Sequence, residues 1–170
     1  NEEIAFLIEW NDPTSSIDEL FPDAVSLQFP VKISDGRDKP HFAMGEPGKS
    51  VNIWLWKAKD IHGVRVEEMN ASGMETLKRQ PDDSQDIHSH SIWQNGRWIV
   101  IIKRPLITLD IKGDVQFHKN SLIPIAMAVW DGANGEIDAR KSLSSWYYLR
   151  LVSGTPSSVY LYVLIGILGA

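Results

Sequence analysis

The side chains of this sequence best suited to bind a metal are four methionines and five histidines, because the chain contains no cysteine. Met44 lies in a loop-like Pro/Gly setting, 40-PHFAMGEPG-48, whereas Met69 and Met74 lie in a polar stretch and Met127 fits a core strand. A methionine thioether is a soft, neutral metal ligand. Methionine is also a common filler of gaps in cores, so Met44 alone leaves both interpretations open.

Among the histidines, His88 and His90 form the one pattern that suggests chelation. Residues two apart on a strand share a face, so these two imidazoles could bind one zinc ion. The segment 81–90 that contains them is polar, and no third ligand is evident nearby. An exposed polar loop is therefore favoured over a zinc site.

The absence of cysteine excludes disulfides, iron–sulfur clusters held by this chain and thioether-linked c-type haem. The sequence also lacks the common phosphate-binding, dinucleotide-binding, serine-nucleophile and zinc-protease motifs. A net charge of −5 gives no electrostatic support for nucleic-acid binding. We therefore predict no catalytic residue and no nucleic-acid partner.

The elements that must position these side chains are predicted to be strands. Apolar residues alternate with other residues in short stretches rich in β-branched and aromatic side chains, which is typical of strands. Residues 94–97 have the form of a tight hairpin, and helical signals are limited to one turn within 14–21 and a short helix within 67–80. We predict an all-β fold, an antiparallel β-sandwich with a few short helices. The alternating stretches are 4–10, 25–31, 51–55, 98–102, 123–129 and 145–152.

The last twenty residues differ from the rest of the chain. No residue from 151 to 170 is charged, and 159-VYLYVLIGILGA-170 is almost wholly apolar. A membrane-spanning helix needs roughly 20 apolar residues, more than this run contains. We expect a domain over 1–151 and an apolar tail over 152–170, which is a final core strand, a docking segment or the start of a membrane anchor.

Seven tryptophans raise a second functional hypothesis. Trp54 and Trp56 share one face of a predicted strand and could form a platform that stacks on sugars. Tryptophan is also good core material. A carbohydrate-binding β-sandwich module therefore stands as the alternative to a cofactor-binding protein.

Three longer motifs follow one another along the chain: N-I-W-x-W-K-A at 52–58, G-R-W-x-V-x-x-K-R-P-L at 96–106 and A-V-W-D-G-x-N-G-E-x-x-x-R-K-S at 128–142. Together with 8-IEWNDPTSS-16 and 20-LFPDAVSLQFPV-31, they resemble the haem b-binding gamma subunits of periplasmic molybdenum enzymes of the dimethyl sulfoxide reductase type. That family includes gamma subunits of ethylbenzene dehydrogenase, dimethylsulfide dehydrogenase, and selenate and chlorate reductases, with relatives in nitrite oxidation or nitrate reduction. The resemblance covers residues 4 to about 151.

The resemblance implies one non-covalent b-type haem (iron protoporphyrin IX) with an axial methionine and an axial lysine. The F-x-M-G context of the methionine matches Met44, and the R-K-S context of the lysine matches Lys141. A lysine binds iron only as the free amine, and deprotonation from a pKa of about 10.4 costs roughly 4 to 5 kcal/mol at pH 7. Burial reduces this cost, and the iron–nitrogen bond offsets the rest. Two axial ligands leave no open position for a substrate, which favours electron transfer.

The remaining haem contacts are predicted from placement along the chain. Trp54, Trp56 and Trp130 are expected to wall the pocket. Arg104 or Lys103 is expected to pair with a haem propionate.

The resemblance further implies a non-catalytic subunit of an oxidoreductase complex. Such a subunit relays electrons between an iron–sulfur beta subunit, itself bound to a molybdenum alpha subunit, and an external carrier. That carrier would be a c-type cytochrome or a quinone-linked carrier. The expected location is periplasmic or otherwise extracytoplasmic, with membrane association if the apolar tail is an anchor.

Overall fold

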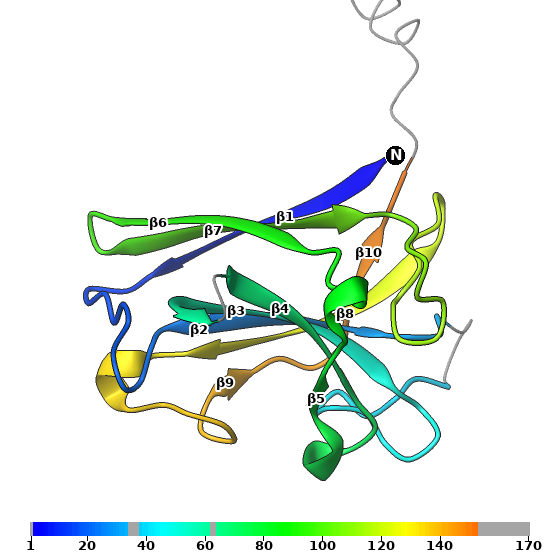
Figure 1. Cartoon of the computed structure of the whole chain (residues 1–170), viewed down its shortest axis with the longest axis horizontal. Helices are drawn as coiled ribbons and strands as arrows, with labels where there is room; N and C mark the ends of the chain where they lie inside the picture. Colours follow the sequence, from blue (N-terminus) through cyan, green and yellow to red (C-terminus); the bar gives the residue numbers. More distant parts are fainter. Residues whose placement is uncertain (1, 34–37, 62–63, 153–170) are drawn as a thin grey trace, which may run out of the picture.

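Two antiparallel sheets face each other in the computed structural model, which describes residues 2–33, 38–61 and 64–152 (Figure 1). The smaller sheet has the strand order β1–β7–β6, and the larger has the order β10–β8–β2–β3–β4–β5, with β9 also paired to β8. The predicted all-β sandwich is confirmed. The strands are β1 (Glu3–Asn11), β2 (Ala24–Pro30), β3 (Val51–Ile61), β4 (Val64–Ala71), β5 (Lys78–Arg79), β6 (His88–Gln94), β7 (Arg97–Pro105), β8 (Leu122–Trp130), β9 (Ser142–Leu143) and β10 (Tyr147–Arg150).

Aromatic side chains fill the space between the sheets. On β3, Trp54 and Trp56 point into this core, where Trp54 lies 5.0 Å from Phe29 and Trp56 lies 5.0 Å from Trp98 between ring centroids. Both β3 tryptophans are 0% exposed. A side chain that solvent cannot reach cannot stack on a sugar, so the predicted carbohydrate platform is wrong.

The helical part of the described chain is limited to three single 3₁₀ turns, at Met74–Thr76, Asp82–Ser84 and Gly132–Asn134. The turn predicted within 14–21 is absent. Backbone N–H groups there bond elsewhere, since Ser16 donates to the Asp23 carboxylate (2.8 Å) and Asp18 donates to the Ala58 carbonyl (2.8 Å). Tertiary partners thus override a weak local helix signal.

The helix predicted within 67–80 is also mostly wrong. Strand β4 runs through this segment to Ala71 because it pairs residue by residue with β3, and only one 3₁₀ turn precedes β5. The polar loop predicted over 81–90 ends early, because β6 begins at His88. The hairpin at 94–97 is present between β6 and β7. Asn95 and Gly96 both have positive φ (53° and 70°), as a type I′ turn requires.

Among the described residues, no helix is long and apolar enough to cross a membrane. The predicted apolar tail, 152–170, lies outside the described residues apart from Val152.

Three charged side chains form a fully buried cluster at the end of β7. Arg104 Nη1 lies 2.6 Å from Glu68 Oε1 and 3.5 Å from Asp114 Oδ1. The guanidinium also lies over Trp54, 4.9 Å from its ring centroid. Because one guanidinium balances only one of two carboxylates, the second is costly to ionise. Burial raises the pKa of Glu68 to about 7, and burial also raises the pKa of Asp114.

This cluster predicts that stability falls as pH rises from about 4.5 to about 7, the ordinary and the folded-state pKa of Glu68. In that window Glu68 is ionised in the unfolded chain but still protonated in the folded chain. Rising pH therefore stabilises the unfolded state relative to the folded state, and the free energy of unfolding falls. The loss should amount to about 3 kcal/mol. Urea unfolding at several pH values measures it in the wild type and in E68Q.

The E68Q variant should have a flatter pH profile over this window. The neighbouring E67Q variant is the control, because Glu67 pairs with Arg79 at the sheet edge and leaves Glu68 in place. Equal slopes in the wild type and E68Q would show that Glu68 does not retain its proton in the folded state.

Candidate cofactor site

A pocket of about 770 Å³ lies on the face of the larger sheet that points away from the smaller sheet. Alternate residues of β2 and β3 form its floor, because the intervening residues of both strands point into the core. All four methionines of the chain line this pocket, although the sequence places them far apart: Met44, Met69, Met74 and Met127.

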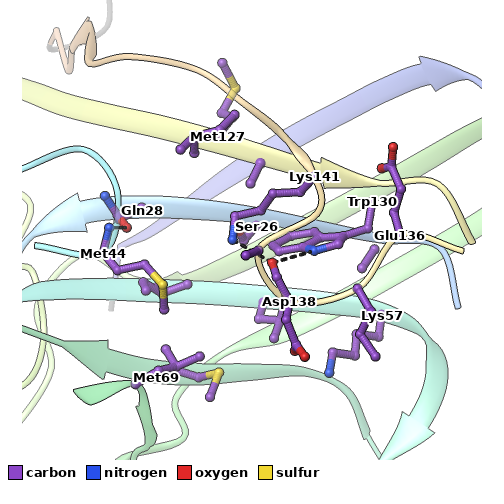
Figure 2. Close-up of a pocket in the computed structure, with 18 of the residues that line it drawn as sticks. Ser26, Gln28, Met44, Lys57, Met69, Met127, Trp130, Glu136, Asp138 and Lys141 are labelled. Carbon is purple, nitrogen blue, oxygen red and sulfur yellow. Dashed lines mark hydrogen bonds between the residues drawn. The ribbon is translucent and has the colours of Figure 1, made fainter. Parts of the chain in front are cut away.

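Two separate segments supply the walls that carry the predicted ligands. Met44 comes from the loop that precedes β3, and Lys141 comes from the segment that follows β8. Figure 2 shows both side chains extending into the same space above the sheet. The fold therefore brings together two residues that the sequence separates by most of its length.

Met44 is held in a conformation that few residues other than glycine adopt. Its φ is 65°, in the left-handed region, which costs a side-chain-bearing residue about 1 to 2 kcal/mol. Three hydrogen bonds oppose this cost. The Met44 N–H donates to Gln28 Oε1 (3.2 Å), Gln28 Nε2 donates to the Phe42 carbonyl (2.7 Å), and the Gly73 N–H donates to the Met44 carbonyl (2.8 Å). The strained turn is thus fixed to the sheet beneath it.

Lys141 is half-buried, and burial lowers the pKa of its amine, whereas the charge of Asp138 opposes that shift. Its Nζ donates to the Asp138 carbonyl oxygen (2.8 Å) and lies 5.0 Å from the Trp130 ring centroid. The Trp130 indole N–H donates to the same carbonyl (3.2 Å). A lysine displaced toward its neutral form is the kind of amine that a metal can accept.

Comparison with known proteins gives a consistent result. The sequence pattern of the ethylbenzene dehydrogenase family matches residues 66–142. The dimethylsulfide dehydrogenase subunit gamma of Rhodovulum sulfidophilum is 32% identical over 157 residues, covering 85% of this chain and 54% of the relative. The chlorate reductase subunit gamma of Ideonella dechloratans is 30% identical over 148 residues, covering 84% of this chain and 58% of the relative.

A third relative comes from Haloferax mediterranei and is described as a respiratory nitrate reductase heme subunit. It is 28% identical over 163 residues, covering 94% of this chain and 55% of the relative. The chain belongs to the family that contains these proteins. It spans little more than half the length of the curated relatives it matches.

For this family member, the structure places only part of the predicted site at the pocket. Met44, Lys141 and Trp130 line it, and their roles as cofactor contacts stay predictions. Trp54 and Trp56 do not line it, because they lie on the opposite, core-facing side of β3. The structure therefore does not bring these two tryptophans to this pocket, and their role as cofactor contacts stays a prediction.

The two residues predicted to pair with a propionate are also elsewhere. Arg104 lies in the buried cluster with Glu68 and Asp114. Lys103 lies on the smaller sheet, where its Nζ is 3.1 Å from Glu3 Oε2. Neither cation lines the pocket.

Sequence reasoning missed Lys57 and Gln28 as pocket residues and treated Met69 and Met127 as weak candidates. For Lys57, the sequence does contain a pattern that could have indicated the pocket. Lys57 follows Ile53 and Leu55 at alternate positions, so all three share one face of the strand. The sequence alone does not show which face of that strand packs against the core, because both faces are apolar over residues 53–56.

The zinc hypothesis gains no third ligand. His88 and His90 lie on β6 and line a separate pocket of about 610 Å³. Within the described ranges, the potential metal-binding group of three side chains is Asp12, Asp23 and Asp131, which contains no histidine. Asp23 accepts hydrogen bonds from Ser16, Trp98 and Gly132, so it already serves the fold.

Gly45 should be essential to the turn that presents Met44. Its φ is 76°, and a Cβ there would lie 2.8 Å from the Lys49 carbonyl oxygen. Gly48 is a matched control, because its φ is 83° but a Cβ there meets no atom within 4 Å. The G48A variant should lose about 1 kcal/mol of unfolding free energy from backbone strain alone. The G45A variant should lose clearly more in urea unfolding, and equal losses would contradict the tight packing of this turn.

Proposed function

We propose that this chain is an electron-transfer subunit that binds one non-covalent b-type haem in the methionine-lined pocket, with Met44 and Lys141 as axial ligands. The observation that carries the proposal is that these two side chains enter one pocket from separate walls. The names of the relatives support it, since one is described as a heme subunit and two as gamma subunits of oxidoreductases.

The residues present fit a haem. The pocket volume falls within the usual range for small-molecule and cofactor sites. Its lining combines thioethers and aliphatic side chains with the partly desolvated amine of Lys141. When bound, the haem supplies reversible one-electron redox chemistry.

The protein's own residues would hold this group and restrict access to it. Met44 is fixed by Gln28, and Lys141 is positioned beside Trp130 by the Asp138 carbonyl. If both side chains are ligands, no coordination position is left for a substrate. The subunit is therefore proposed to be non-catalytic.

We further propose partners and a location. Relatives named as gamma subunits favour a complex with an iron–sulfur beta subunit and a molybdenum alpha subunit. The proposed external carrier is a c-type cytochrome or a quinone-linked carrier. The sequence resemblance favours a periplasmic or extracytoplasmic location, and the uncharged tail after residue 150 favours contact with a membrane.

The first test is a reduced-minus-oxidised visible spectrum with a pyridine haemochrome assay. Wild-type protein should contain one low-spin b-type haem per chain. Both M44A and K141A should lose the six-coordinate low-spin spectrum, because each removes one axial ligand.

M127L is the matched control, since Met127 also lines the pocket and leucine preserves its apolar volume. Its spectrum should match that of the wild type. If folded wild-type protein, produced with ample haem, contains none, the proposed function is wrong. If K141A keeps the low-spin spectrum, the lysine assignment is wrong.

Haem affinity should also depend on pH. A protonated lysine cannot bind iron, so the affinity should rise as pH rises toward the lowered pKa of Lys141. The rise should approach tenfold per pH unit well below that pKa. Titration of apo-protein with haem between pH 6 and 9 measures this slope. The K141M variant should lose it and M44A should retain it, whereas an unchanged slope in K141M would exclude Lys141 as its source.

A further inference from the structure

We infer that Lys57 binds a propionate of the haem and thereby sets the orientation of the haem in the pocket. This inference rests on the proposed function and extends it to the anionic edge of the cofactor. It replaces the propionate partners expected from the sequence, because Arg104 and Lys103 both lie away from the pocket.

The register of the larger sheet places Lys57 at one end of the pocket floor. Along β2 and β3 the floor pairs are Gln28 with Ile53, Ser26 with Leu55 and Ala24 with Lys57. Gln28 holds the Met44 turn. Lys57 therefore lies two floor pairs away from that turn, about 13 Å along the strand.

The ammonium of Lys57 has no partner among the residues that the structure describes. The other two pocket lysines differ in this respect, since Lys141 Nζ donates to the Asp138 carbonyl and Lys59 Nζ donates to the Glu19 carbonyl (3.4 Å). A half-buried cation beside apolar side chains is costly without a counter-charge. An anionic group of the ligand removes that cost, and a haem propionate is such a group.

Two carboxylates, Glu136 and Asp138, line the same pocket and are alternative partners for the Lys57 ammonium. Glu136 is engaged, because its Oε2 accepts the Asp131 N–H (2.9 Å). Asp138 lies on the same side of the pocket as Lys57 in Figure 2, but the two side chains form no ion pair. The experiment must therefore separate pairing with a propionate from pairing with Asp138.

The test compares haem with haem dimethyl ester, in which both propionate charges are removed. Apo-protein of the full chain is titrated with each compound, and the Soret band reports affinity and spin state. Wild-type protein should prefer haem over the ester. In K57M this preference should fall roughly tenfold, as expected for a half-buried charge pair. The low-spin spectrum should remain, since the axial ligands are untouched.

Two further variants complete the design. K57R restores a cation and should restore the preference for haem, which shows that K57M has not acted through misfolding. K103M removes the same charge on the smaller sheet and should match the wild type. If K57M lowers the affinity for haem and for the ester equally, Lys57 pairs with Asp138 or supports the fold and does not bind a propionate. That result would overturn the inference.

The outcome for the wild type separates this inference from the function it rests on. If wild-type protein binds both compounds with a low-spin spectrum and K57M leaves their ratio unchanged, only the Lys57 assignment fails. If wild-type protein gives no low-spin complex with either compound, the proposed function fails, and the Lys57 assignment fails with it.

Discussion

The structure depends on a central strand, β3, whose two faces have different roles. On its inner face, β3 places Trp54 and Trp56 among the aromatic rings of the core. On its outer face, Ile53, Leu55 and Lys57 form part of the pocket floor. Because successive side chains of a strand point to opposite faces, the packing that secures the core also sets the position of the site. A change in register would disturb both at once.

Hydrogen bonds within the protein hold both walls of the site. On one side, the strained Met44 turn is tied to β2 through Gln28. On the other side, Trp130 and Lys141 share the carbonyl oxygen of Asp138 as their acceptor. A preorganised site spends less binding energy on ordering its side chains. Both walls thus hold the side chains of Met44 and Lys141 at the pocket.

Two cations, Arg104 and Lys57, differ in whether the described part of the protein supplies a counter-charge. Arg104 lies among Glu68, Asp114 and the face of Trp54, so its charge is compensated within the core. Lys57 borders the pocket without such compensation among the described residues. A cation with internal partners serves the fold, whereas a cation without them is available to an anionic ligand. This difference, and not closeness in sequence to a motif, is the reason for proposing Lys57 as the partner of an anionic group.

The sequence by itself determined the fold class, the 94–97 hairpin and the family, because alternation and ordered motifs are local properties of the chain. It also singled out Met44 and Lys141, which the fold then places in one pocket. Only the tertiary structure decided which face of β3 meets the core. Both faces of that strand are apolar over Ile53–Trp56, so alternation cannot distinguish them. The smaller sheet covers the face of β3 that carries the tryptophans. The pocket therefore lies on the opposite face of β3, together with Lys57.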